Sequence, residues 1–418
     1  MSFGGVNTFQ QYSTDFGLGH NGVRVSFNYF DGIPEPSLLN ALASNELKLI
    51  FKSLLKRDET TKEKALGDLL KLIENYNEHS YLFDDDIFFL CWSQVYPKLL
   101  VSESKAIRIG SHVVTAKLIK LLNKRISKFL KDLVPLILMG VCDTDLSVSK
   151  ASVTQLNDVF DNDSNKVSSL WFMFQEYILN VIHEIIVKEN EETISDERFI
   201  GKEDSQLRFN RLITSAVYLL TNLTESDKFD SKKHKDIYHD IVMTESLWKL
   251  LNLKNLHFLK SYEAALRLQQ SLYTGGYLTT HKDVLKISTR KLLKSLSQVS
   301  SKNVLKVAQL TGLILDTLTM LNDYKDGRIW SYDKSSKEKL LNFLNIASKK
   351  PSPGFFNSMF KFYQKTKGNG LIDVKDWLPI WRGSVKALNE MPFLGRFGAE
   401  LLGELWNNYR KFVSVSNQ

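Results

Sequence analysis

The stretch Thr61-Lys62-Glu63-Lys64-Ala65-Leu66-Gly67-Asp68-Leu69-Leu70-Lys71-Leu72 carries a pattern that the chain repeats twice more. Ala65, a small residue, lies four positions after Thr61, and mostly apolar residues follow at eight and eleven positions. The same pattern begins again at Ile107, 46 residues later, and at Val148, a further 41 residues later. These positions fall on one helical face, where the small residue lets a neighbouring helix approach closely. Because HEAT and armadillo helix pairs repeat every ~40–47 residues, we predict an all-α, HEAT/ARM-like helical-repeat solenoid.

This repeat pattern divides the chain into three predicted parts. Residues 1–45 lack helical periodicity and form an irregular, non-repeat N-terminal arm. Residues 46–165 hold HEAT-like helix pairs, and residues 166–418 continue as irregular helical repeats, with surface loops predicted at 189–204 and 225–236. The predicted helices are 47–55, 60–76, 84–99, 104–122, 127–141, 147–160, 167–189, 205–223, 237–251, 261–272, 282–296, 301–321, 335–348, 354–366 and 392–413.

The composition is typical of an ordinary folded protein. Of 418 residues, 43% are hydrophobic and 24% charged, so global disorder is not expected. The two cysteines lie in apolar helical runs with no secretory pattern before them, which indicates a reducing compartment and a cytoplasmic (cytosolic) protein. The longest apolar run, 133–142, is about half of the ~20 residues that a membrane span requires. We therefore expect no membrane association.

The net charge of +8 hides a marked polarity along the chain. Between Lys98 and Lys131 there are nine basic side chains and one acidic one, whereas 151–204 holds four basic and twelve acidic ones. If one helix continued in phase beyond Lys117, its basic residues would form a single stripe suited to a phosphate backbone. The alternative is that such lysines only solvate the outer face of the repeats.

Several local motifs that could mark a functional site have simpler structural explanations. Gly17-Leu18-Gly19-His20-Asn21-Gly22 matches the dinucleotide fingerprint, but no buried strand precedes it and no helix follows, so a turn is favoured. The adjacent pair Ser111-His112 points in different directions on a helix and makes a poor nucleophile and base. Asp84-Asp85-Asp86 at a helix start is better explained by the helix dipole than by a cation. The scattered cysteines and histidines supply no metal site, and no cofactor is predicted.

The turn around Tyr29, Phe30 and Asp31 either fixes the arm to the helices or forms a partner-binding knob.

Several longer blocks resemble a known family. They are 1–9, 54–66, 131–143, 195–198 and 330–339, and the second reads Leu-Leu-Lys-Arg-Asp-Glu-Thr-Thr-Lys-Glu-Lys-Ala-Leu. In this order they are similar to the amino-terminal domain of the listerin family of RING-type E3 ubiquitin ligases, in its budding-yeast form. The likeness extends over essentially the whole chain.

This resemblance implies a function in ribosome-associated quality control. Members would dock on the large ribosomal subunit after subunit splitting, beside the partner that recognises the exposed peptidyl-tRNA, and a carboxy-terminal RING would ubiquitylate the stalled nascent chain. The sequence reaches Gln418 without a zinc-ligand array, so the RING, its zinc and the ubiquitin-conjugating enzyme are expected to lie outside this chain, and no catalytic residue is expected in it.

Charge and position, not the resemblance, suggest which residues touch ribosomal RNA or a partner. These docking candidates are Lys56, Arg57, Lys62, Lys64, Lys117, Lys120, Lys124, Arg125, Lys128 and Lys131. The main alternative is a HEAT-type scaffold or transport receptor that binds protein cargo, for which binding would depend little on salt. A stand-alone enzyme is disfavoured because no constellation of nucleophile, base or metal appears in the sequence.

Overall fold

The three helices that carry the repeat pattern pack side by side. They are α4 (Glu59–Glu74), α7 (Lys105–Leu122) and α9 (Leu146–Val159). Their small residues Ala65, Ser111 and Ser152 are all buried. The helices approach so closely that a Cβ atom at Gly110 of α7 would lie 3.1 Å from Leu66 Cδ1 of α4. The repeat pattern therefore marks one layer of adjacent helices, as predicted.

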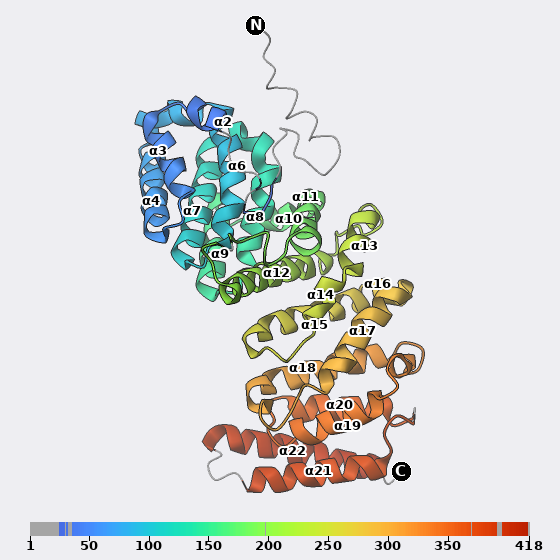
Figure 1. Ribbon diagram of the computed structural model, residues 1–418. Helices are drawn as coiled ribbons and strands as arrows, with labels where there is room; N and C mark the ends of the chain where they lie inside the picture. The colour runs from blue at the N-terminus through green and yellow to red at the C-terminus, as the bar shows by residue number, and fades with distance from the viewer. Residues whose placement is uncertain are drawn as a thin grey trace. The chain divides into compact units, whose positions relative to one another are not determined.

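The computed structural model describes residues 25–29, 31, 36–196, 198–368, 370–390 and 395–416. Across these residues the secondary structure is helical with short loops and without a β-strand, which confirms the all-α fold class (Figure 1). The chain divides into two compact units, Met1–Ile241 and Val242–Gln418. Each is described by itself.

The first unit pairs the α4–α7–α9 layer with a second layer of helices. Successive members of that layer, α3, α6, α8 and α11, contact one another, and α12 packs against α11 and α8. Their bounds are α3 Asn45–Leu54, α6 Asp86–Val101, α8 Leu130–Val141, α11 Gln175–His183 and α12 Lys202–Thr224. Shorter helices and turns complete the unit: α2 Pro36–Ala41, α5 Tyr76–His79, η1 Ser80–Phe83, η2 Asn123–Phe129, α10 Ser164–Met173 and η3 Glu184–Lys188. Helix α13, Lys235–Met243, spans the boundary between the units.

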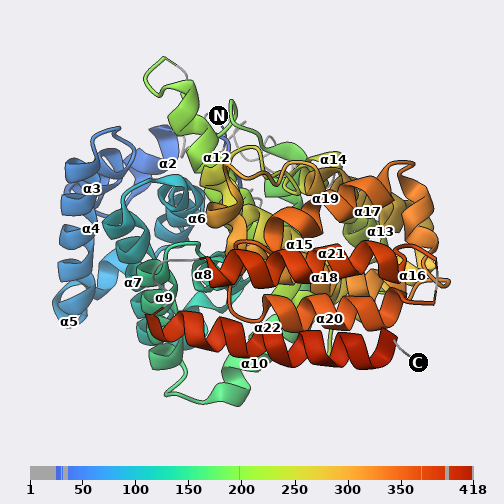
Figure 2. The ribbon, with the colours of Figure 1, turned by 90° about the horizontal axis from the view of Figure 1, so that it is seen from below.

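The second unit also has two layers. In one layer α15, α18, α20 and α22 contact each other in that order, and in the other α14 contacts α17, which contacts α19, which contacts α21. Figure 2 shows α20 and α22 side by side. The bounds are α14 Glu245–Lys249, α15 Leu259–Thr274, α17 Lys282–Leu296, α18 Val304–Asn322, α19 Ser336–Ala347, α20 Phe355–Thr366, α21 Val374–Asn389 and α22 Gly395–Ser416, with short turns η4 Leu256–Phe258, α16 Tyr277–Thr280 and η5 Arg328–Tyr332.

Among the described helices, α18 is long and apolar enough to cross a membrane by length and composition. It lies between α15 and α20, however, and its apolar residues form the core of the second unit. Its hydrophobicity is that of a central core helix.

Two predicted helices are broken in the structure. The helix predicted at 167–189 is broken at Phe174, where its two halves meet at 62°. The helix predicted at 237–251 is broken at Thr244. The helix predicted at 104–122 is confirmed as α7, which ends at Leu122. It does not continue in phase, as the single basic stripe would require, because Asn123 adopts φ of +47° and a 3₁₀ segment follows. In addition α21, with its fully buried Trp377 and Trp381, was not predicted.

The part of the N-terminal arm that the structure describes is docked onto the first unit. The side chain of Phe27 is fully buried. Lys98 of α6 donates hydrogen bonds to the carbonyl oxygens of Ser26, at 2.7 Å, and Asn28. The Tyr29 N–H donates to the carbonyl oxygen of Thr193 at 2.7 Å. The arm is thus fixed to α6 and to the 189–201 loop, and that loop is more than a surface connection because Ile194 and its two successors are buried.

Asp132, in the first turn of α8, is a buried carboxyl group whose Oδ2 atom has no hydrogen-bond partner. Burial raises its pKa from 3.8 to about 7, against the opposing effect of Lys131. Because the unfolded carboxyl group titrates at its ordinary pKa, folding is disfavoured by this group increasingly as pH rises from about 4 to about 7. We expect Asp132→Asn to raise the melting temperature by several degrees at pH 8 and to leave it nearly unchanged at pH 4. Thermal unfolding of both proteins across this range measures the difference, and a constant difference at all pH values would contradict the argument.

Candidate functional site

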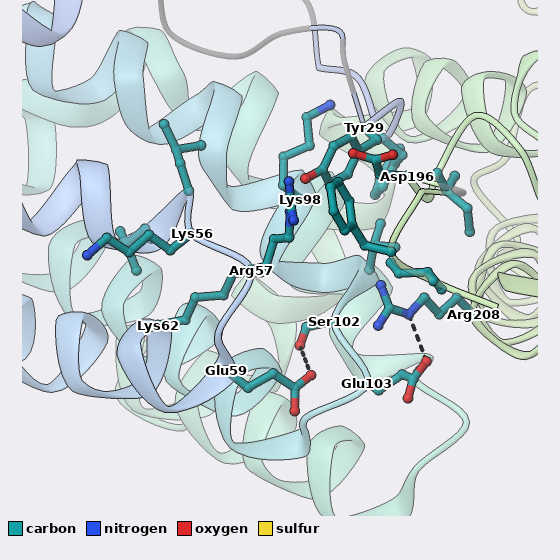
Figure 3. A pocket seen from close by; sticks show the side chains of 17 residues that line it. Tyr29, Lys56, Arg57, Glu59, Lys62, Lys98, Ser102, Glu103, Asp196 and Arg208 are labelled. Carbon is teal, nitrogen blue, oxygen red and sulfur yellow. Dashed lines mark hydrogen bonds and ion pairs between the residues drawn. The ribbon is translucent and has the colours of Figure 1, made fainter. Parts of the chain in front are cut away.

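A cavity of about 370 Å³ in the first unit collects charged and aromatic side chains from four separate segments (Figure 3). The segments are the docked arm, the connection from α3 to α4, the end of α6 and the stretch from the 189–201 loop into α12. The lining residues are Phe27, Tyr29, Leu54, Leu55, Lys56, Arg57, Glu59, Lys62, Lys98, Val101, Ser102, Glu103, Ile194, Asp196, Phe199, Ile200 and Arg208. We call this the basic cavity.

Two arginines hold the wall of the basic cavity that follows α6. Arg211 of α12 donates to the carbonyl oxygens of Leu100, Val101 and Ser102 at 2.7–3.0 Å. Arg108 of α7 donates to the carbonyl oxygens of Ser102 and Glu103 at 2.8 and 2.9 Å. The last carbonyl groups of α6 would otherwise be unsatisfied, so these guanidinium groups cap the helix and fix the position of the 101–103 segment.

The carboxylate of Asp143 balances these two buried guanidinium groups. Its Oδ2 atom lies 2.9 Å from Arg108 Nε and 3.8 Å from Arg211 Nη1. Asp143 and Arg108 are almost fully buried, so their charges depend on each other for compensation. We call Arg108, Arg211 and Asp143 the buried ion cluster.

The opposite wall is fixed by the cap of α4. The Asp58 carboxylate accepts hydrogen bonds from the backbone N–H of Thr61 at 2.7 Å and from its hydroxyl group. These bonds, with the hydroxyl bond contributing most, lower the pKa of Asp58. This N-cap places Lys56 and Arg57 just before the helix and Lys62 in its first turns.

The acidic residues of the basic cavity already have hydrogen-bond or ion-pair partners. Glu103 accepts from Arg208 Nε at 2.7 Å, and Glu59 accepts from the Ser102 hydroxyl at 3.3 Å (Figure 3). Asp196 pairs with Arg198 at 2.9 Å. The lining holds more basic than acidic side chains, so positive charge is in excess.

The basic side chains are less completely compensated. The Arg57 guanidinium lies over the Phe199 ring, 3.0 Å from its centroid, as in a cation–π contact. Lys62 is half-buried and makes no side-chain hydrogen bond or ion pair with the part of the chain that the structure describes. Burial lowers the pKa of Lys62, and the positive charge of Arg208 lowers it further. Lys62 and Arg208 therefore face a common region with like charges.

The structure brings together one group of docking candidates and separates the other. Lys56, Arg57 and Lys62 line the basic cavity with Tyr29, although the Lys56 side chain extends away from the other labelled cations in Figure 3. Lys64 is exposed on α4 and is not part of the lining. The Asp31 N–H donates to the Asn28 carbonyl oxygen at 3.3 Å. Phe30 and the glycine motif at 17–22 lie outside the described residues.

The basic candidates between 117 and 131 do not form one helical stripe, because they are divided among α7, η2 and α8. Most of them pair with acids from elements about 40 residues away in sequence: Lys117 with Glu74, Lys120 with Asp158 at 2.8 Å, Arg125 with Asp84 at 2.6 Å and Lys128 with Asp86. Lys131 is only 8% exposed, whereas Lys124 is exposed. Their role in docking stays a prediction.

Other candidate chemistry has a structural explanation. His112 is buried, its Nδ1 shares a 2.6 Å hydrogen bond with the Tyr96 hydroxyl, and burial lowers its pKa to about 4. The Ser111 hydroxyl instead donates to the Arg108 carbonyl oxygen. Asp85 caps α6. Within the described residues no three cysteine, histidine or acidic side chains are grouped as metal ligands would be.

Lys98, Phe199 and Arg208 were not predicted as site residues. Phe199 and Arg208 are separated from α4 by more than 120 residues, so only the tertiary fold brings them to the basic cavity. The one signal in the sequence is the block at 195–198, which resembles a family and directly precedes Phe199.

The sequence profile described as "E3 ubiquitin-protein ligase listerin, N-terminal domain" matches residues 42–366. This match covers most of the chain and nearly all of the basic cavity. The chain belongs to the listerin family.

Several listerins are similar to this chain. That of Saccharomyces cerevisiae is 55% identical over 419 residues, which cover 100% of this chain and 27% of that protein. The Neurospora crassa protein is 32% identical over 200 residues, covering 48% and 12%, and the Schizosaccharomyces pombe protein is 22% identical over 365 residues, covering 83% and 22%. All three are named E3 ubiquitin-protein ligase listerin. The chain spans at most about a quarter of the length of these listerins, in the region of their N-terminal domain.

Proposed function

We propose that this chain is the docking domain through which a listerin-type ligase binds the large ribosomal subunit that carries a stalled nascent chain. A RING domain elsewhere in the ligase would then ubiquitylate that chain with its ubiquitin-conjugating enzyme in the cytosol. The match to the listerin N-terminal domain over residues 42–366 is the observation that carries this proposal. The partner that recognises peptidyl-tRNA would bind beside it.

The distribution of compensated and uncompensated charges supports contact with RNA near the start of α4. Lys56, Arg57, Lys62 and Lys64 form no ion pair with any described residue. Such cations release counterions when they neutralise phosphates, which gives sequence-independent affinity. The paired cations Lys117, Lys120, Arg125 and Lys128 would first have to give up their acidic partners. We therefore assign the larger share of RNA contact to the α4 group.

Cosedimentation with isolated large subunits tests this assignment. We expect Lys56→Glu/Lys64→Glu, which reverses two exposed charges, to weaken binding about tenfold or more at low salt. Removal of two phosphate contacts should also lower the slope of log affinity against log salt by about two units. Wild-type binding itself should fall steeply between 50 and 200 mM salt, values at which such contacts typically lose affinity.

The matched control is Lys120→Glu/Lys128→Glu, which reverses the same number of charges at paired positions. We expect a smaller loss from this variant. An equal or larger loss would move the contact surface to the 117–131 region, and unchanged binding by both variants would contradict phosphate docking. Binding that barely responds to salt would favour the protein-cargo alternative.

A further inference from the structure

The basic cavity resembles a small-molecule site in its volume, its lining and its fixed walls. Docking on a flat surface would need none of these features. Its volume of about 370 Å³ lies within the range of about 300–1,000 Å³ typical of small-molecule sites. Its walls combine apolar side chains, such as Ile194 and Val101, with a few converging polar groups. Both walls are fixed, one by the buried ion cluster and the other by the Asp58 cap. The site is therefore largely preformed.

The charges in the basic cavity favour an anion. Lys62 loses hydration through partial burial and receives no ion pair from the described residues in return. The Nε atom of Arg208 donates a hydrogen bond to Glu103. The terminal nitrogen atoms of Arg208 form no hydrogen bond or ion pair with the described residues. Arg57 is held in place by Phe199. A bound anion would offset the cost of holding these three cations near one another.

The same arrangement favours a phosphate group over a carboxylate. The basic residues of the lining outnumber the acids Glu59, Glu103 and Asp196, so the attraction of the cavity for an anion grows with the charge of that anion. A phosphomonoester carries about −1.5 to −2 charges at pH 7 and three strong acceptor oxygen atoms. Arginine forks bind such oxygen atoms in pairs, and lysine adds a point charge.

We propose that the basic cavity binds a phosphomonoester, with Lys62, Arg57 and Arg208 around the phosphate and the apolar wall against the organic group. This proposal goes beyond subunit docking. Arg57 and Lys62 belong to both proposals, so AMP binding is measured in the absence of the subunit. The ligand is either a free small molecule or the 5′-phosphorylated end of a chain, since both present the same group.

Calorimetric titration of the 418-residue chain with AMP at low ionic strength tests the proposal. We expect AMP to bind, adenosine not to bind, and Lys62→Met to weaken AMP binding at least tenfold. Lys62→Arg should restore most of the affinity. The control is Lys64→Met, which removes an identical charge from the exposed face of α4 and should bind AMP as the wild-type chain does.

A comparison of short RNA oligonucleotides with 5′-phosphate and 5′-hydroxyl ends identifies the source. Tighter binding of the 5′-phosphorylated than of the 5′-hydroxyl oligonucleotide assigns the site to a chain end, and equal binding of the two, with AMP still bound, assigns it to a small molecule. Either result supports the phosphate site. Equal binding of AMP and adenosine, no binding of AMP, or an equal loss in Lys62→Met and Lys64→Met overturns it.

A measurement on the unmodified chain guards against misfolded variants. AMP should slow the acylation of Lys62 by an amine-reactive reagent at least threefold and leave Lys64 unaffected, as read by peptide mass spectrometry. Absence of this protection would also overturn the proposal. Subunit cosedimentation of the same variants is scored separately, so loss of AMP binding with intact docking, or the reverse, tells the two proposals apart.

Discussion

Replacing Gly140 with alanine is expected to destabilise the first unit by about 3 kcal/mol or more, at the upper end of the usual cost of overpacking a core. A Cβ atom at this position of α8 would lie 2.3 Å from two atoms of the His112 ring and 2.7 Å from Ser152 Oγ. The ring cannot easily withdraw, because it is buried and hydrogen-bonded to Tyr96. Urea unfolding followed by circular dichroism measures the change, which corresponds to a melting temperature lower by about 6–12 °C.

Gly67→Ala is the matched control for this substitution. Gly67 also lies inside a helix, α4, but nothing is within 4 Å of the position that its Cβ atom would take. Alanine should therefore stabilise the chain by about 0.5–1 kcal/mol, because it favours the helix over the unfolded state. Similar free energies of unfolding for the two variants would show that the close approach of His112 and Ser152 does not make Gly140→Ala destabilising.

Arg108→Met is expected to cost about 3–5 kcal/mol, the usual range when one partner of a buried ion pair is removed. The substitution leaves the Asp143 carboxylate buried with the Arg211 guanidinium at 3.8 Å and the Asp145 N–H at 2.7 Å. It also removes the hydrogen bonds to the carbonyl oxygens of Ser102 and Glu103, which follow α6. Methionine keeps much of the side-chain volume, so the loss reports on charge and hydrogen bonding. Chemical denaturation at neutral pH measures the change in the free energy of unfolding.

Arg125→Met removes an arginine whose ion pair with Asp84 lies at the surface, where both side chains are more than half exposed. Solvent screens such pairs, so this variant should lose at most about 1 kcal/mol. The contrast between the two arginines isolates the effect of burial. A loss of similar size in both would contradict the role assigned to the buried ion cluster.

The sequence predicted a helix correctly where its hydrophobic periodicity and its capping or helix-breaking residues gave the same boundaries. The repeat pattern located α4, α7 and α9 within two residues at each end, because their stripes and caps are local features. Helix α21 was not predicted because Pro379 and Gly383 interrupt the helical pattern of its sequence. In the structure the helix is continuous, and the buried Trp377 and Trp381 anchor it in the core. The break at Phe174 carries no proline or glycine. There the side chain of Gln175 bonds to the backbone of Lys228 and Asp230, a distant contact that sequence does not reveal.

The candidate site was predicted only in part, for a related reason. Lys56, Arg57 and Lys62 are close in sequence and could be selected together by their charge. Whether each cation forms an ion pair depends on which acids the fold brings near it. The observed pairs join helices about 40 residues apart in sequence. Charge counting therefore gave the same weight to Lys120, which pairs with Asp158, and to Lys62, which forms no ion pair with the described residues.

The hydrogen bond between Tyr29 and Thr193 has a consequence for how the first unit is made. During synthesis, residues 25–29 emerge long before the 189–201 loop, so Tyr29 can form this hydrogen bond only after more than 160 further residues have been added. A stack of repeats with only neighbouring contacts can grow stepwise from one end. Here a segment added late, the 189–201 loop, contacts the arm, and removal of residues 25–29 would leave the buried position of Phe27 empty.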